Sequence, residues 1–190
     1  NYITNEQGRQ DHVANTLPSP YYRFDGADDY VDLARTADLL IGAQKFTLSV
    51  WFNCEDVSVA NQTILSFHNL GAAYHTIKIY ISSSTIYWYT GQAAGDSRSV
   101  SASVTPGWHH IVGVRSDDDA GDLESLKMYL DGVEVGSEIT DAAPEDLTNH
   151  STARWTIGAA YNNHGTRSRL FNGQIRDVKI FPSVLTAPDV

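Results

Sequence analysis

The chain has 190 residues, a formal net charge of −10 and a single cysteine, Cys54. Its length suggests one domain, with a core large enough to need neither a disulfide nor a metal. Proteins bind nucleic acids and anionic membrane surfaces mainly through Lys and Arg, so 13 basic residues scattered among 23 acidic ones disfavour both partners.

The chain divides into a polar start and a long region of strand patterns. Residues 1–20 are polar and end with Pro18 and Pro20, which predicts a linker or arm outside the core. From Tyr21 to residue 190, short strand patterns recur with Gly, Asp and Asn between them, which indicates one all-β domain. The sequence contains no run of ~18 apolar residues, so no membrane insertion is expected.

Several segments alternate between apolar and other residues, as half-buried strands do. The residues that face one way are Phe46, Leu48, Val50 and Phe52, then Ile77, Ile79 and Ile81, then Ile86 and Trp88, and finally Leu126, Met128 and Leu130. In an antiparallel sandwich the aliphatic face lies against the core. The pattern therefore predicts two antiparallel sheets packed face to face.

The opposite faces of the same segments carry many aromatic residues, namely Trp51, Tyr80, Tyr87, Tyr89 and Tyr129. A solvent-facing sheet normally carries Thr, Ser, Lys and Glu, so these rings need an explanation. Aromatic rings are large, stiff and amphipathic, and they stack on sugar faces at low entropic cost. Two interpretations stay open: the rings form a shared ligand platform, or long loops fold over them as a second small core.

A second candidate for ligand contact is the segment that follows the strand pattern at residues 155–160. It contains Tyr161, Asn162, Asn163, His164 and Arg167. Asn, His and Arg offer the planar donors and acceptors that read hydroxyls or carboxylates. The alternative is an ordinary loop rich in Asn and Gly.

Five phrases carry a family resemblance in their order along the chain. They are Phe24–Val31, Phe46–Phe52, Trp108–Val114, Tyr129–Val133 and Phe171–Val178. From about Tyr21 to the C-terminus the chain resembles the laminin-G-like, or concanavalin-A-like, jelly-roll family. The resemblance implies an all-β fold of two antiparallel sheets, a jelly-roll β-sandwich that serves mostly as a recognition scaffold. It also implies that glycans are a frequent ligand of the curved sheet's concave face.

The same resemblance implies a structural calcium ion. In relatives such an ion often ties the first strand, an early loop and the last strand together. By this resemblance Asp25 and Asp177 are the expected metal ligands, together with a backbone carbonyl near Gln44, since calcium prefers hard oxygen ligands. Without a metal, Asp25 is expected to form a turn before Gly26.

The fold also houses glycoside hydrolases and polysaccharide lyases, so catalysis needs a direct test. Hydrolysis of a glycosidic bond usually needs two carboxylates, and jelly-roll hydrolases commonly carry a Glu-x-Asp-x-x-Glu triplet that this sequence lacks. Jelly-roll alginate lyases carry Gln-Ile-His on one strand. Here Gln174 and Ile175 are followed by Arg176, so the base is missing. We therefore expect no enzymatic activity.

These observations predict a non-catalytic recognition domain that binds a carbohydrate or a surface protein. A glycan is the first expectation, because the aromatic residues suit a sugar. The alternative is a protein-adhesion or assembly domain of a larger complex, such as a bacteriophage tail or head appendage. Each of these roles predicts an extracellular, cell-surface or virion-surface location.

Overall fold

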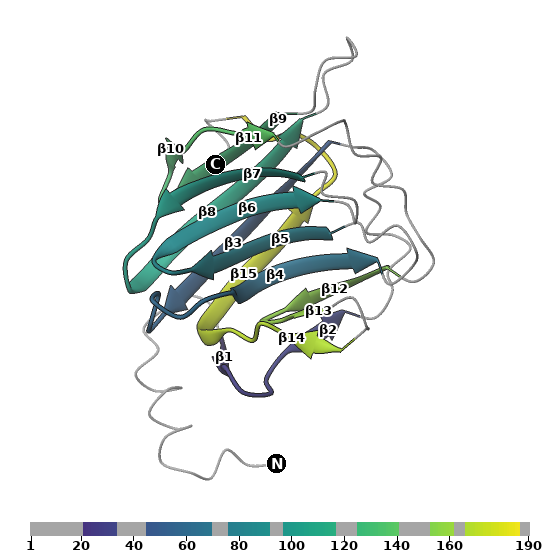
Figure 1. The fold of residues 1–190 in the computed structure, drawn as a ribbon. Helices are drawn as coiled ribbons and strands as arrows, with labels where there is room; N and C mark the ends of the chain where they lie inside the picture. Colours follow the sequence, from purple (N-terminus) through teal and green to yellow (C-terminus); the bar gives the residue numbers. More distant parts are fainter. Residues whose placement is uncertain are drawn as a thin grey trace.

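The structure is a computed structural model that describes residues 21–33, 45–69, 76–91, 97–116, 125–140, 153–161 and 166–186. All regular secondary structure in these ranges is β, as the alternation predicted (Figure 1). None of the described residues belongs to a helix that could cross a membrane. The polar residues 1–20, expected to form an arm, lie outside the described ranges.

The described strands form two large antiparallel sheets and one small hairpin. In chain order they are β1 (Tyr22–Asp25), β2 (Val31–Leu33), β3 (Phe46–Cys54), β4 (Gln62–Asn69), β5 (Thr76–Ser82), β6 (Thr85–Gly91), β7 (Ser97–Ser103), β8 (Gly107–Ser116), β9 (Ser125–Leu130), β10 (Val133–Val135), β11 (Ile139–Thr140), β12 (Ala153–Ile157), β13 (Ala160–Tyr161), β14 (Arg167–Ser168) and β15 (Asn172–Phe181). One sheet has six strands in the order β1-β15-β3-β8-β9-β10. The other has seven strands in the order β11-β7-β6-β5-β4-β12-β2, and β13 pairs with β14.

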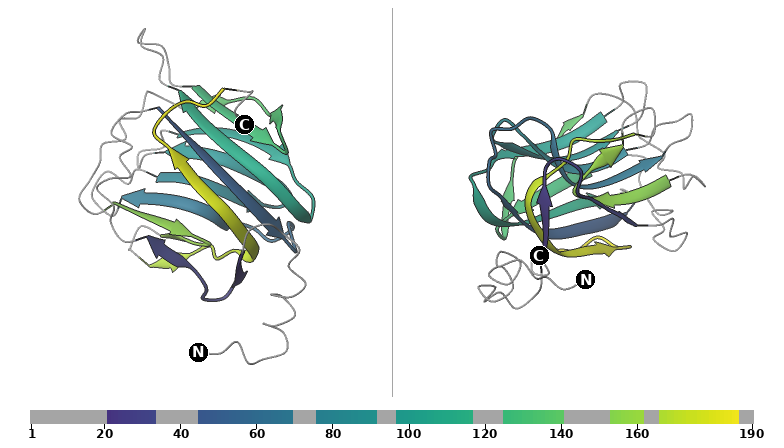
Figure 2. Two further views of the ribbon diagram at one scale, coloured as in Figure 1. Left: turned by 180° about the vertical axis from the view of Figure 1, so that it is seen from behind. Right: turned by 90° about the horizontal axis from the view of Figure 1, so that it is seen from below.

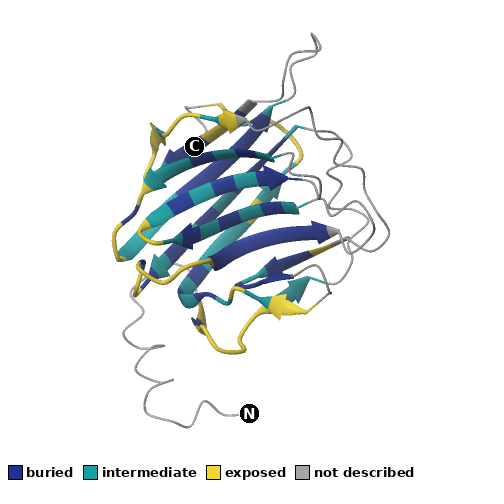
Figure 3. Ribbon diagram, viewed as in Figure 1, coloured by how far each residue is buried: buried dark blue, intermediate teal, exposed yellow. Residues whose placement is uncertain are grey.

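The two sheets lie face to face, which is the jelly-roll sandwich predicted from the sequence. In Figure 1 the seven-stranded sheet lies in front of the six-stranded one, and the view from behind in Figure 2 brings β15, β3 and β8 forward. Buried and half-buried residues alternate along β5 and β6 (Figure 3). Each sheet therefore has one face in the core and an outer face on the opposite side.

The core is built from the apolar faces that the alternation identified. Leu48, Val50 and Ile79 are fully buried in it. Trp88, also fully buried, reaches across to Gly113 on β8, where a Cβ atom would lie 2.7 Å from the indole. The Trp88 Nε1 donates a hydrogen bond of 3.2 Å to the Val114 carbonyl, so the buried N–H of the indole has a hydrogen-bond partner.

An ion pair at one end of the sandwich ties the two sheets together. The Arg98 side chain on β7 is 1% exposed, and its Nη1 lies 2.9 Å from Glu138 Oε1. The other carboxylate oxygen of Glu138 accepts a hydrogen bond of 2.9 Å from the Leu126 amide on β9. Glu138 therefore pairs with the buried Arg98 guanidinium on one sheet and accepts a hydrogen bond from the backbone of a strand in the other.

Candidate functional site

Three tyrosines and one lysine form a cluster on the outer face of the seven-stranded sheet. We call Lys78, Tyr80, Tyr87 and Tyr89 the tyrosine platform. Tyr80 on β5 pairs with Tyr87 on β6, and their rings stack with centroids 4.8 Å apart. Lys78 pairs with Tyr89, whose ring meets Tyr80 edge to face at 6.4 Å. All four are half-buried, so their surfaces remain partly accessible.

The strand register explains why these residues meet. Ile77, Ile79 and Ile81 point into the core, so the residues between them must point outward on β5. Directly opposite residues of an antiparallel pair lie close enough for their side chains to interact. On the far side of β6 the partners of Tyr87 and Tyr89 are Ser101 and Ser99. These small polar side chains leave the rings open along that flank.

A glycine makes room for the last ring of the platform. A Cβ atom at Gly91 would overlap the hydroxyl and ring of Tyr89. Only a residue without a side chain lets the Tyr89 ring lie back over the strand at this position. The position of Tyr89 therefore depends on Gly91, which is its second neighbour on β6.

Positive charge gathers at the platform although the protein as a whole is acidic. The Lys78 ammonium lies 4.6 Å from the Tyr89 ring centroid and 5.2 Å from that of Tyr80. The pKa of Lys78 is lowered to about 8, mainly by burial and secondly by the charge of Arg169. Burial raises the pKa of Tyr80 to about 12, so its hydroxyl stays neutral. Among the described residues, no carboxylate lies within 4 Å of the Lys78 or Arg169 cation.

The hairpin β13–β14 covers the other half of the same outer face. The Ser66 hydroxyl on β4 donates to the Ala159 carbonyl at 2.9 Å, and the His68 ring stacks on Tyr161 at 6.4 Å. The Tyr161 hydroxyl donates to Asp32 Oδ2 at 2.8 Å. The platform is therefore bounded on one side by this hairpin, and among the described residues no other segment is seen to pack on the outer face of β5 and β6.

The Asp32 carboxylate accepts several polar contacts beneath the hairpin. Its Oδ2 accepts a hydrogen bond of 2.9 Å from Arg167 Nη2, and Arg154 Nη1 lies 3.7 Å away. The Arg167 guanidinium also lies 4.1 Å from the Tyr30 ring centroid. His68 is buried next to this network. Its pKa is lowered to about 4, mainly by burial and secondly by the charges of Lys78 and Arg169. His68 is thus neutral near pH 7.

The structure places the sequence-predicted contact residues in different surroundings. Tyr161 is 8% exposed and supports the hairpin from below, so its ring is not available for stacking on a ligand. Arg167, with its side chain 37% exposed, remains a predicted contact residue at the hairpin. Asn162, Asn163 and His164 lie outside the described residues.

The expectation that all five aromatic residues share one face was wrong. Tyr129 on β9 lies on the outer face of the six-stranded sheet, where it is 6% exposed and packs with Val112 and Val114. Trp51 lies on that same outer face and stacks on His110 with ring centroids 4.9 Å apart. Alternation places a side chain inside or outside the sandwich, and the two sheets have separate outer faces. Of the five predicted aromatic residues, the tyrosine platform therefore contains Tyr80, Tyr87 and Tyr89.

The expectation that Asp25 and Asp177 share a metal ion was also wrong. In the β1–β15 pairing, Asp25 lies opposite Asn172. Asp177 follows five residues further along β15, which at about 3.3 Å per residue is roughly 16 Å away. That separation is several times the length of a calcium–oxygen bond. The predicted carbonyl near Gln44 lies outside the described residues.

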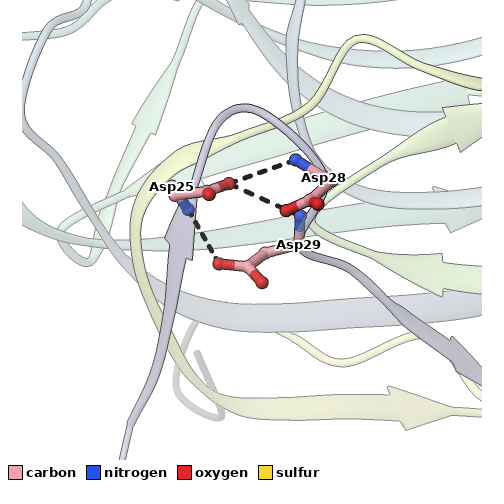
Figure 4. Close-up of side chains that lie close together, drawn as sticks. All are labelled: Asp25, Asp28 and Asp29. Atoms are coloured by element: carbon pink, nitrogen blue, oxygen red, sulfur yellow. Dashed lines mark hydrogen bonds between the residues drawn. The ribbon is translucent and has the colours of Figure 1, made fainter.

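Asp25 has closer acidic neighbours in the turn that follows β1. One carboxylate oxygen from each of Asp25, Asp28 and Asp29 lies within 4.8 Å of the others (Figure 4). Asp25 Oδ1 accepts hydrogen bonds from the amides of Ala27 at 2.8 Å and Asp28 at 3.2 Å, which lowers the pKa of Asp25. Ligands of one calcium ion lie up to about 5 Å apart, so this spacing suits calcium.

The sequence patterns did not identify the two cations of the site, Lys78 and Arg169. For Lys78 a signal was present, because it alternates with Ile77 and Ile79 and so faces the same way as Tyr80. For Arg169 no local pattern existed. It follows β14, and the Arg169 carbonyl accepts a hydrogen bond of 2.9 Å from the Thr63 amide on β4. Only this long-range contact brings it to the platform.

Comparison with protein families gives one match over most of the chain. Residues 25–190 match the family model of the concanavalin A-like lectin/glucanases superfamily. A search of the curated proteins found no match.

Comparison with solved structures gives matches of low sequence identity. The Ruminococcus gnavus IT-sialidase CBM40 aligns with a TM-score of 0.65 and 14% identity, over 88% of this chain and 92% of that chain. A heptameric SAP-like pentraxin from Limulus polyphemus aligns with a TM-score of 0.58 and 15% identity, over 88% and 77%. NanB sialidase from Streptococcus pneumoniae aligns with a TM-score of 0.63 and 18% identity, over 88% of this chain but 26% of the sialidase chain. These similarities support the fold.

Proposed function

Because the chain belongs to the concanavalin A-like lectin/glucanases superfamily, we propose that it is a non-catalytic carbohydrate-binding domain. It binds a glycan outside the cell or on a cell or virion surface. The observation that carries this proposal is the tyrosine platform. It consists of three half-buried rings on the outer face of one sheet, with serines along one flank. Rings of this kind stack on sugars, and polar neighbours orient the hydroxyls.

The two cations favour a glycan that carries an acidic group. Lys78 and Arg169 concentrate positive charge at the platform of a protein with a net charge of −10. A carboxylate on the ligand would accept charge-assisted hydrogen bonds there, which are stronger than neutral ones. Two similar structures support this class of ligand, since the Ruminococcus gnavus CBM40 is bound to α2,3 sialyllactose and the binding domain of botulinum neurotoxin DC is in complex with SialylT.

The test is a binding titration with sialyllactose and with lactose on the wild-type domain and two variants. The double variant Tyr87→Ala, Tyr89→Ala removes two platform rings, and we expect affinity to fall by about tenfold or more because stacking contributes roughly 1 kcal/mol per ring. Tyr22→Ala is the matched control, because Tyr22 is 66% exposed and belongs to the other sheet.

The melting temperature separates the two interpretations of the rings. An unchanged melting temperature with lost binding supports a ligand platform. A large loss of stability in the double variant would show that the rings belong to a second core. If neither sugar nor any other glycan on an array binds the wild-type domain, the proposal is wrong and a protein partner becomes the better explanation.

We further propose that the turn after β1 holds a structural calcium ion through Asp25, Asp28 and Asp29. The three carboxylates supply hard oxygen ligands on one exposed turn. Asp25 Oδ1 is engaged by backbone amides, so its second oxygen is the one available to an ion. The ion would neutralise three like charges that otherwise repel each other next to the β1–β2 connection.

A further inference from the structure

A second pocket lies on the outer face of the six-stranded sheet, on the side of the sandwich away from the tyrosine platform. Its volume is about 210 Å³. Aromatic, aliphatic, charged and hydroxyl-bearing side chains all contribute to its wall. The lining residues are Ser49, Trp51, His110, Val112, Asp177, Lys179, Phe181 and Leu185.

A β-bulge in β15 builds one wall of this pocket. Arg176 pairs with Trp51 on β3, and the next registered pair is Lys179 with Ser49, so the register shifts between Arg176 and Lys179. One extra residue therefore lies on β15 between two residues that both face outward. The bulge brings Asp177 to the pocket wall, which Lys179 also lines, and Asp177 Oδ2 lies 3.8 Å from Arg176 Nε.

The bulge residue Asp177 has an unusual backbone conformation. Asp177 has a φ of 50°, in the left-handed region that is uncommon for residues other than glycine. Bulges of this kind re-aim a side chain and gather next to binding sites. Strained positions persist where the surrounding structure over-determines them, and they cluster at functional sites. Here the strained residue is also the one that supplies the carboxylate.

The opposite wall is held in place by a network of contacts. Trp51 and His110 stack with ring planes 20° apart, and Ser49 Oγ lies 2.8 Å from His110 Nε2. The Arg176 guanidinium lies 5.0 Å from the Trp51 ring and 4.8 Å from the Trp108 ring. These contacts fix the rings before a ligand arrives, which lowers the entropic cost of binding.

We propose that this pocket is a second binding site, independent of the tyrosine platform, that takes a single sugar ring. A sugar hydroxyl both donates and accepts hydrogen bonds, and the pocket offers an acceptor in Asp177 and a donor in Lys179. Phe181 and Leu185 offer an apolar surface for the face of the ring. The volume is below the roughly 300 Å³ at which drug-sized pockets begin, so the pocket suits a single ring.

The test is a titration of the ¹⁵N-labelled domain with free monosaccharides, followed by NMR. The probes are glucose, galactose, N-acetylglucosamine, N-acetylgalactosamine and glucuronate, each taken to high millimolar concentration. The readout is the indole N–H resonance of Trp51. We expect at least one probe to shift this resonance in a saturable way with a millimolar Kd, the range reached by ligands with few atoms.

Two variants locate the binding. Asp177→Asn removes the charge but tolerates the left-handed conformation, and we expect roughly tenfold weaker binding because a charge-assisted hydrogen bond is lost. Tyr87→Ala alters only the platform and should leave the Trp51 titration unchanged. If Asp177→Asn does not fold, which its amide spectrum reveals, Lys179→Gln serves for the same comparison.

Three results would overturn the proposal. In the first, none of the probes shifts the Trp51 indole. In the second, the shift is equally strong in the pocket variant and the wild-type domain. In the third, Tyr87→Ala abolishes it, which would assign the sugar to the platform. A result of this kind leaves the proposed glycan binding at the platform intact, since that rests on separate residues and a separate titration.

Discussion

The Lys78 ammonium lies 4.6 Å from the centroid of the Tyr89 ring, across the β5–β6 pairing. A cation over an aromatic face is attracted by the electron-rich ring. This contact keeps the charge at the surface of the platform, although burial disfavours it. The same arrangement leaves the ammonium hydrogens free of any described carboxylate, so an acidic ligand can accept them.

Affinity for an acidic glycan should depend on pH through Lys78. The pKa of Lys78 is lowered to about 8, so the ammonium is charged below that pH and neutral above it. Tyr80, with its pKa raised to about 12, stays neutral over this range. We expect affinity for sialyllactose to be highest below about pH 8 and to fall as the pH rises through it.

Calorimetric titrations between about pH 6 and about pH 10 measure this dependence. Lactose is the matched neutral ligand, and its affinity should stay constant over the same range. Lys78→Met keeps most of the side-chain stem and should remove the pH dependence for sialyllactose. A dependence that persists in Lys78→Met would assign it to another group.

Stability should fall in mild acid because of His68. Its pKa is lowered from 6.5 to about 4 in the folded protein, so the unfolded state takes up a proton first as the pH falls. The stabilisation is complete above the unfolded pKa and is lost progressively between about pH 6.5 and about pH 4, by about 3 kcal/mol in total. Urea unfolding across this range measures it. His68→Gln should show a flatter profile, and an equally steep one would exclude His68 as the cause.

Two glycine substitutions should separate stability from binding. Gly113→Ala places a methyl group 2.7 Å from the buried Trp88 indole, so we expect the free energy of unfolding to fall by about 1–3 kcal/mol with ligand affinity unchanged. Gly91→Ala instead displaces the half-buried Tyr89 ring, so affinity should fall with little change in stability. Thermal melts and sugar titrations on both variants test this contrast. Equal effects on stability would contradict it.

Removing the charge of Glu138 should destabilise the sandwich. Glu138→Gln leaves the Arg98 side chain, which is 1% exposed, without the carboxylate at 2.9 Å, and breaking such a buried pair costs about 3–5 kcal/mol. Glu134→Gln is the matched control, since Glu134 pairs with Lys127 at 3.7 Å with both side chains more than half exposed. A surface pair of this kind contributes at most about 1 kcal/mol. Denaturant unfolding compares the two variants, and similar losses would contradict the buried role of Glu138.

Calcium should raise the melting temperature of the wild-type domain relative to the same protein in EDTA, because a ligand that binds only the folded state stabilises it. Asp28→Asn removes one proposed ligand, while the Asp28 amide can still donate to Asp25. We expect this variant to lose the calcium effect and to match the wild type in EDTA. A wild-type melting temperature that does not respond to calcium would rule out the structural ion.

The alternation along the strands was sufficient to predict the fold class and part of the core. Ile77, Ile79 and Trp88 are buried as the pattern required, because a strand directs successive side chains to opposite faces and only one face can meet the other sheet. The family resemblance was equally local, since it rested on short phrases that each lie within or next to one strand.

The site depended on relationships that no local pattern contains. Tyr87 and Tyr129 both point away from the core, yet they belong to different sheets, and only the strand order assigns them to opposite sides of the molecule. Arg169 joins the platform through a contact between distant segments. Asp177 faces its pocket because of a bulge in the β15–β3 register. The sequence by itself therefore determined which residues face inward, whereas only the tertiary structure decided which outward-facing residues meet, because strand neighbours are set by the topology of the whole chain.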